Sequence, residues 1–217
     1  MKNIVFIMDI DINGDSRHSS NRRFGYKYSI DSWKRWCDKN DCELFILNDL
    51  LVDNNEMEIC WQRFYLFDIL ESNEINYDQV LMVNANTIVH TDCPNFFKMT
   101  DRKFCGVHFD GGYDWVLRGV ENYSKHMFNG YIMPWDKYFD CGFMVVNKIH
   151  KSFFKKVLDF YHKNVVTLKQ LQETFHNGTD QIPVNFLIHK ENIDLKLLPY
   201  EFNMNDMARK NILTDDL

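Results

Sequence analysis

Residues 77–97 read YDQVLMVNANTIVHTDCPNFF, and this segment says more about the fold than any other part of the chain. Val80–Val83 is a short, continuous apolar run, which is typical of a buried strand. The run stops at Asn84-Ala85-Asn86, where one residue separates two polar side chains, and apolar residues resume at Thr87-Ile88-Val89. On an extended backbone, side chains at i and i+2 point to the same side. At the carboxyl end of a sheet strand, such a pair lies where ligands of open α/β sheets bind.

The composition fits one globular domain over residues 1–217, which is long enough to bury a substantial core. The chain could also be one domain of a longer protein. A net charge of −6 and a pI near 5.7 argue against nucleic acid as the main partner. Residues 17–23 form a local basic segment, which we interpret as a solvated loop, with a phosphate contact as the alternative.

The cysteines and the apolar runs indicate where the protein resides. No run approaches the roughly 20 apolar residues that span a bilayer, and the N-terminus shows no secretory signal. The six cysteines contain no Cys-x-x-Cys pair, so buried free thiols are expected rather than a structural zinc site. We therefore expect a cytoplasmic protein without a membrane span.

Apolar periodicity predicts strands that alternate with helices. The predicted strands cover residues 3–8, 43–47, 80–83, 104–109, 143–147 and 196–198. The predicted helices cover residues 28–39, 58–72, 150–162, 168–175 and 182–188, with Ser29 as a candidate cap for the first. Residues 110–134 show no clear periodicity, and such long connections tend to be functional. This order favours an α/β fold with a mixed, mainly parallel sheet flanked by helices.

The order of these segments resembles the GT-A fold, the Rossmann-like fold of many nucleotide-sugar glycosyltransferases. The matching elements are the first strand, the helix with Trp61-Gln-Arg63, the strand ending at residue 84, and the segments 138–147, 178–185 and 198–203. Together they span roughly residues 3–205. The resemblance implies transfer of a sugar from a UDP- or GDP-linked donor to an acceptor hydroxyl on a glycan or protein, with retention at the anomeric carbon.

One departure from the family concerns its Asp-x-Asp motif, which stands here as Asn84-Ala85-Asn86. In the family, the two carboxylates hold Mn²⁺ or Mg²⁺, which neutralises the departing diphosphate. The degenerate ligand set in this chain would be Asn84, Asn86 and Asn203. Three interpretations stay open: a metal-independent transferase, a catalytically weakened relative, or a laboratory Asp→Asn variant. A plain strand end or Asx turn is the structural alternative.

The resemblance also assigns the remaining candidate site residues. It implies that Asp180 and Gln181 lie near the anomeric carbon, although Asp180 could simply begin a helix. The implied donor-binding residues are Asp9, Arg63, Asn84, Asn86, Asp140 and Gly142. Arg63 could pair with phosphate, since a guanidinium binds phosphate through two parallel hydrogen bonds.

Other residues admit both functional and structural interpretations. His108 and Asp110 could be metal ligands, but a structural role is favoured. Five residues between 110 and 135 could stack on an acceptor sugar or belong to the core, namely Trp115, Tyr123, His126, Tyr131 and Trp135.

Two rival functions remain. A transferase-like module could bind the nucleotide sugar without turnover. A nucleotidyltransferase is disfavoured, because residues 9–14 are acidic and lack the Gly-rich, Lys-bearing loop that triphosphates require.

Overall fold

The computed structural model describes residues 1–12, 20–109, 111–176 and 180–204, and for residues 20–24 it describes the backbone alone. The strands are β1 (Lys2–Met8), β2 (Cys42–Leu47), β3 (Tyr77–Val83), β4 (Phe104–His108), β5 (Phe139–Asn147) and β6 (Leu195–Leu198). The helices are α1 (Ser20–Asn40), α2 (Ile59–Gln62), α3 (Leu66–Ser72), α4 (Tyr113–His126), α5 (Lys151–Phe175) and α6 (Gln181–Lys190). Short 3-10 helices cover Arg63–Tyr65, Phe96–Met99, Trp135–Lys137, Lys148–His150 and Tyr200–Phe202.

The strands form one mixed sheet in the order β2-β1-β3-β5-β4-β6. The pairs β1–β2, β1–β3 and β4–β6 are parallel, while β5 runs antiparallel to both of its neighbours. All strands except β5 therefore end at the same edge of the sheet, and β5 begins there. This arrangement confirms the predicted α/β fold with a mainly parallel sheet.

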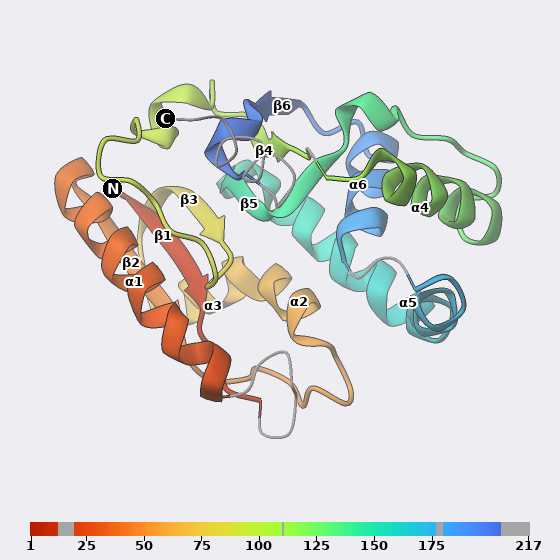
Figure 1. The fold of residues 1–217 in the computed structure, drawn as a ribbon, viewed down its shortest axis with the longest axis horizontal. Coiled ribbons are helices and arrows are strands. Elements are labelled where there is room, and N and C mark those ends of the chain that lie inside the picture. Colours follow the sequence, from red (N-terminus) through yellow and green to blue (C-terminus); the bar gives the residue numbers. More distant parts are fainter. Residues whose placement is uncertain (13–19, 110, 177–179, 205–217) are drawn as a thin grey trace, which may run out of the picture.

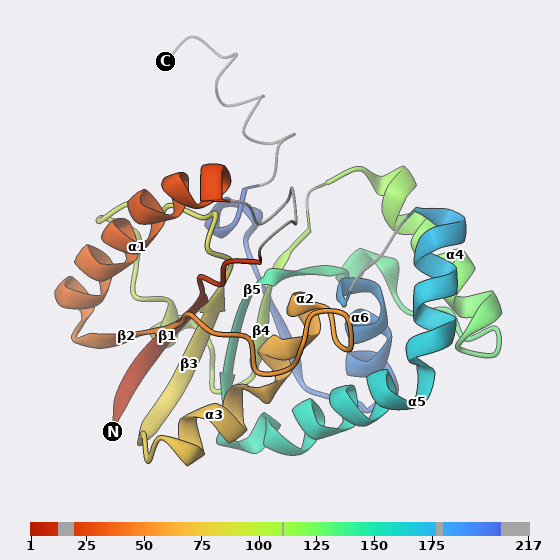
Figure 2. The ribbon, with the colours of Figure 1, turned by 90° about the horizontal axis from the view of Figure 1, so that it is seen from below.

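Helices cover both faces of the sheet, as Figures 1 and 2 show. Successive strand residues point to opposite faces, so Ile4 and Phe6 join one core while Val5 and Ile7 join the other. The first core contains the apolar residues of α2, α3, α5 and α6. The second packs α1 and the segment around Phe96 against the sheet. Burial on both faces explains why the central strands are continuous apolar runs.

The predicted positions of four helices need correction. The first helix begins at Ser20 rather than residue 28, so Ser29 is a buried residue inside α1 and not its cap. The predicted helices at 150–162 and 168–175 are one continuous helix, α5. The linking residues include the β-branched sequence Val165-Val166-Thr167, which lowers helix propensity only slightly when packing supports the helix. The predicted helix at 58–72 is instead α2 and α3, joined by a 3-10 turn.

The interpretation of residues 110–134 as a long connection was also wrong. The stretch 110–134 contains α4, which buries Val116, Val120 and Tyr123 at spacings of four and three residues. Its three-residue stripe surrounds a buried Gly119, which weakened the periodic signal. Thr87-Ile88-Val89 does not resume a strand.

No helix in the described ranges combines the length and the apolar character needed to cross a membrane.

Candidate functional site

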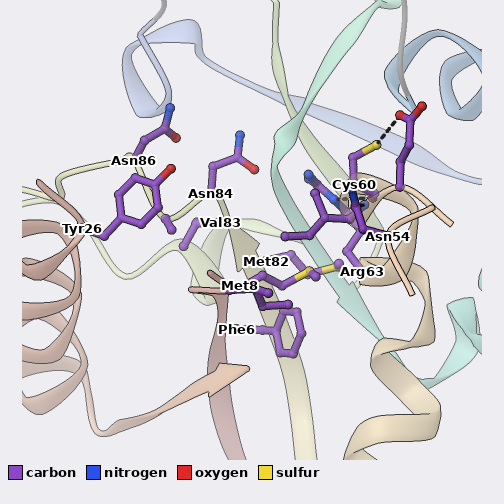
Figure 3. Close-up of a pocket in the computed structure, with 14 residues that line it drawn as sticks. Phe6, Met8, Tyr26, Asn54, Cys60, Arg63, Met82, Val83, Asn84 and Asn86 are labelled. Carbon is purple, nitrogen blue, oxygen red and sulfur yellow. Dashed lines mark hydrogen bonds between the residues drawn. The ribbon is translucent and has the colours of Figure 1, made fainter. Parts of the chain in front are cut away.

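A cavity of about 250 Å³ opens at the edge where the parallel strands end (Figure 3). This volume is slightly below the roughly 300–1,000 Å³ that small-molecule sites occupy. Apolar side chains of β1 and β3 and of the residues that follow β1 line part of it, and Tyr26 of α1 lines another part. Polar side chains come from two segments, the one around α2 and the loop after β3. These polar residues are Asn54, Glu58, Cys60, Arg63, Asn84 and Asn86.

The Asn84-Ala85-Asn86 segment is a turn rather than extended backbone. The backbone N–H and the hydroxyl of Thr87 both donate to the carbonyl of Asn84, at 3.2 and 2.8 Å. Ala85 is buried, whereas Asn84 is half-buried and Asn86 is exposed. Figure 3 shows the two amide side chains next to each other on this turn. The expected common orientation is therefore present, although a turn and not an extended strand produces it.

Helix α1 holds the turn in place. The indole N–H of Trp33 donates to the hydroxyl of Thr87 at 3.0 Å, and the N–H of Val89 donates to the hydroxyl of Ser32 at 3.1 Å. Because the Thr87 hydroxyl also bonds the Asn84 carbonyl, a continuous chain of hydrogen bonds connects α1 with Asn84. Trp33 and Ser32 are both buried, so these bonds are sheltered from water.

A bulge at the start of β5 forms the next part of the site. The pairing with β4 moves from Gly106–Met144 to Val107–Asp140, which leaves residues 141–143 without partners on that strand. Their backbone groups bond elsewhere. The carbonyl of Gly142 accepts from the N–H of Asn84 at 3.0 Å, and the N–H of Gly142 donates to Oδ1 of Asp140 at 2.6 Å.

Gly142 leaves room for the Asn84 side chain. A Cβ at position 142 would lie 2.4 Å from Nδ2 of Asn84 and 2.9 Å from Oδ1 of Asp140. The Asn84 amide therefore occupies the space that any larger residue at 142 would need. The structure thus brings together Asn84, Asp140 and Gly142, three of the residues that the resemblance assigned to a donor site.

Arg63 and Asp180 form a largely buried ion pair beside the bulge. The Arg63 Nε atom lies 3.4 Å from Oδ2 of Asp180, and the two side chains are 17% and 4% exposed. Arg63 also donates through Nε to the carbonyl of Cys60 at 2.9 Å and through Nη1 to the carbonyl of Cys141 at 2.7 Å. Burial is the largest single influence on the pKa of Arg63 and lowers it, but the Asp180 carboxylate and weaker neighbouring acidic groups together raise the pKa above its usual value. Arg63 is thus a fixed positive charge in the cavity wall.

Helix α6 binds the bulge from the other side. Gln181 accepts from the N–H of Cys141 at 3.3 Å, and its amide nitrogen donates to the Tyr138 hydroxyl at 3.4 Å. One helical turn later, the buried Asn185 bonds both backbone groups of Phe139, at 3.0 and 2.9 Å. Asn185 was not among the site residues predicted from the sequence. A signal for it was present in the sequence, because Gln181 and Asn185 are an i, i+4 amide pair and the other residues from 182 to 188 are apolar.

The thiols beside Arg63 remain uncharged. Burial raises the pKa of Cys60 and of Cys141 well above the usual range, and the charge of Asp180 raises both further. The Cys60 thiol lies 3.7 Å from Oε2 of Glu58. All six cysteines are free, as predicted, but only Cys37, Cys105 and Cys141 are fully buried.

Other predicted residues lie at the same edge of the sheet or outside the described part. Asp9 lies between Met8 and Ile10, which line the cavity, and its N–H donates to the Leu47 carbonyl. Asn203 follows β6 and is not among the residues that line the cavity. The His108 ring nitrogen Nε2 lies 3.1 Å from the Asp136 carbonyl, while Asp110 and the basic segment 17–23 fall outside the residues whose side chains are described.

The aromatic residues of the 113–135 region divide into core and surface. Tyr123 is fully buried, and Trp115 packs against Phe109. Tyr131 and Trp135 are exposed, and Trp135 meets the exposed ring of Tyr113 edge-on at 5.9 Å.

The side chains at this site provide few ligands for a divalent metal ion. The two amides supply neutral oxygens, and within the described ranges no three His, Cys, Asp or Glu side chains gather in a way that could hold a metal.

Comparisons with known proteins add to this picture at the level of the fold. No protein-family model and no curated protein sequence matches the chain. Among solved structures, it is similar to a glycosyltransferase involved in the glycosylation of the major capsid of PBCV-1. The TM-score is 0.60 and the identity 10%, with 100% of this chain and 92% of the other covered. It is also similar to the apo form of the glycosyltransferase GlyE of Streptococcus pneumoniae TIGR4, with a TM-score of 0.50 and 12% identity. All of this chain but only 52% of GlyE is covered, so the chain spans about half of that protein.

The chain therefore has the fold of these two glycosyltransferases. Identities of 10% and 12% establish the architecture only, so the function must be argued from the cavity and its residues.

Proposed function

We propose that this protein is a glycosyltransferase of the GT-A type. It takes a sugar from a nucleotide-diphosphate donor, UDP- or GDP-linked, and passes it to a hydroxyl of a glycan or protein acceptor. The observation that carries the proposal is the convergence of four separate segments at the carboxyl edge of the sheet, represented by Arg63, Asn84, Gly142 and Asp180. Ligands of open α/β sheets bind at this edge.

Each part of the cavity suits one part of such a donor. The hollow between β1 and α1, with the ring of Tyr26, suits a nucleoside. The amides of Asn84 and Asn86 and the charge of Arg63 suit the diphosphate, because N–H donors and a guanidinium both bind phosphate oxygens. Gly142 and Asp140 would then lie beside the sugar, where the absent side chain of Gly142 allows a close approach to the backbone.

The proposed reaction breaks the bond between the anomeric carbon and the phosphate oxygen. The bonding electrons leave with the diphosphate, a new bond forms to the acceptor oxygen, and the acceptor proton ends on the diphosphate or in solvent. Positive charge grows on the sugar and negative charge on the leaving group, so Arg63 stabilises the latter. Asp180 and Gln181 remain our candidates for groups near the anomeric carbon, and their bonds to Arg63 and Cys141 give them a positioning role as well. Retention is proposed on the resemblance of this Asp-Gln element alone.

A second candidate function is a binding module without turnover. The two neutral amides favour it, because they replace the carboxylates through which the family holds its metal. Donor hydrolysis separates the two functions. A transferase releases sugar from at least one donor in a panel of UDP- and GDP-sugars, with or without Mn²⁺, whereas the binding module releases none.

Nucleotide binding tests the site itself. UDP or GDP is expected to raise the melting temperature of the protein, and Asn86→Ala should reduce that rise. Asn76→Ala is the matched control, because Asn76 is an exposed asparagine just before β3, at the opposite end of the same strand. No shift with any nucleoside diphosphate, with or without Mn²⁺, would rule out donor binding.

A further inference from the structure

We infer that this site binds a nucleoside diphosphate without a divalent cation, through the amides of Asn84 and Asn86 and the guanidinium of Arg63. The inference rests on the proposed function, and it concerns how the phosphates are neutralised. The fold family implies Mn²⁺ or Mg²⁺ at this place, and the side chains found here do not fit such an ion.

The first reason is the chemistry of the ligands. Hard cations are held chiefly by carboxylate oxygens, and amide carbonyls contribute mostly in company with carboxylates. Glu58 is the acidic side chain among the described residues that line the cavity, and it lies beside the Cys60 thiol. Asn203 is not part of the lining and does not complete a ligand set.

The second reason is the environment of Asn84. A Cβ built on Gly142 would lie 2.4 Å from Nδ2 of Asn84 and 2.9 Å from Oδ1 of Asp140, so these two atoms lie around the same small space. The amide nitrogen therefore faces the side of the bulge on which the Asp140 carboxylate lies. An amide N–H donor at position 84 is compatible with the nearby Asp140 carboxylate without a metal ion. An aspartate at position 84 would place a second carboxylate there, and two carboxylates that share a site repel each other unless a cation lies between them.

The third reason is the Asp140 carboxylate itself. Its Oδ1 atom already accepts the N–H of Gly142 at 2.6 Å, which closes a turn of the backbone. An oxygen held by its own backbone in this way is oriented by the protein without any help from a metal.

The fourth reason is the balance of charge. Two aspartates with one divalent cation carry the same net charge as two asparagines without a cation. The diphosphate therefore meets the same net charge at this position in both cases, while the amide N–H groups replace the metal as its contact. Arg63 adds a positive charge that the fold keeps in place, since it is held by Asp180 and by two carbonyl groups.

Calorimetric titrations of the wild-type protein test the inference directly. Mn²⁺ alone should give no saturable binding, and the Kd of UDP or GDP should agree within about twofold between buffer with EDTA and buffer with Mn²⁺. A gain of tenfold or more in nucleotide affinity with Mn²⁺ would overturn the inference and leave the proposed function intact. Saturable Mn²⁺ binding at this site would overturn it as well. Absence of nucleotide binding under both conditions would remove the proposed function and the inference together.

A variant extends the test in the opposite direction. Asn84→Asp with Asn86→Asp should acquire Mn²⁺ binding and should lose about tenfold or more in nucleotide affinity in EDTA, since two N–H donors become two negative charges. Asn76→Asp is the control, because it adds the same kind of charge at the far end of β3. Unchanged metal binding and unchanged nucleotide affinity in a folded double variant would refute the assignment of the phosphates to this turn.

Discussion

Replacing Asp180 by asparagine is the most informative single perturbation of this site. The substitution keeps the shape of the side chain and removes its charge, so the guanidinium of Arg63 loses its ion-pair partner. Arg63 keeps its hydrogen bonds to the carbonyls of Cys60 and Cys141. The charge itself, however, remains in a site where only 17% of the side chain is exposed.

The separation of the charges sets the size of the effect. At 3.4 Å and an effective dielectric constant of about 20, Coulomb's law gives an attraction of about 5 kcal/mol. Breaking a buried pair by removing one partner typically costs about 3–5 kcal/mol. Because the carbonyl bonds of Arg63 persist, we expect Asp180→Asn to lower the free energy of unfolding by about 3 kcal/mol. For a chain of this length, that corresponds to a fall in Tm of about 6–12 °C.

Chemical denaturation of four proteins would measure this coupling. They are the wild type, Asp180→Asn, Arg63→Gln and the double variant, and we expect the two single costs to exceed the cost of the double by about 2 kcal/mol. Asp114→Asn is the matched control, because Asp114 pairs with Arg118 on the exposed surface of α4. Exposed i, i+4 pairs contribute about 0.3–0.5 kcal/mol, so this control should change stability little.

Two results would refute this reasoning. One is a cost below about 1 kcal/mol for each single substitution, and the other is a double variant whose cost equals the sum of the two. Activity separates positioning from catalysis. If Asp180 acts only by holding Arg63, Asp180→Asn should not lower kcat/KM further in an Arg63→Gln background. A further loss would show that Asp180 contacts the substrate.

Three other predictions test separate parts of the structure. Gly142→Ala should displace the Asn84 amide and weaken nucleotide binding about tenfold or more, while it lowers the free energy of unfolding by less than about 1 kcal/mol. Gly112→Ala is the control, because no atom lies near its added carbon, and it should bind nucleotide normally in the same titration. Burial lowers the pKa of His150 to about 4, so the unfolded state takes up a proton first as the pH falls. The free energy of unfolding should therefore drop by about 2 kcal/mol between pH 7 and pH 5, and denaturation of His150→Asn should lack this component. Trp33→Phe removes the indole hydrogen bond that anchors the loop after β3. It should weaken nucleotide binding several-fold and lower the free energy of unfolding by about 1 kcal/mol. Unaltered nucleotide binding would show that α1 does not hold this loop for the ligand.

The strands could be predicted from the sequence because burial on both faces leaves an unambiguous apolar run, as in Val80–Val83. Helix α4 could not, because its stripe is short and a buried glycine lies within it. Packing against α5 and α6 stabilises this helix more than its own propensities do, and those neighbours are distant in sequence. In α5, Val165 lies between the two helices that were predicted and packs against the first core.

The edge of the sheet at which several candidate residues lie could be predicted, but not the contacts among them. Position in the fold places Asn84, Asp140 and Gly142 at one edge of the sheet, and the structure brings them together. The pairing of Arg63 with Asp180 joins residues far apart in the chain, and no local pattern encodes that distance. Asn203 shows the limit of the resemblance, because its position in the sequence suggested a ligand although it does not line the cavity.

The bulge in β5 explains why these distant segments form one site. The backbone of Cys141 accepts from Arg63 and donates to Gln181, and the backbone of Gly142 accepts from Asn84. Cys141 and Gly142 thus bind three separate segments through their backbone: the helical segment that carries Arg63, helix α6, and the loop after β3. Because these bonds involve only main-chain atoms at 141, the side chain there needs only to fit the core. The residue at 142 must lack a side chain if the Asn84 amide is to keep its position, since a Cβ at 142 would take the space of that amide. The backbone path of β5, more than any single side chain, therefore determines how the site is assembled.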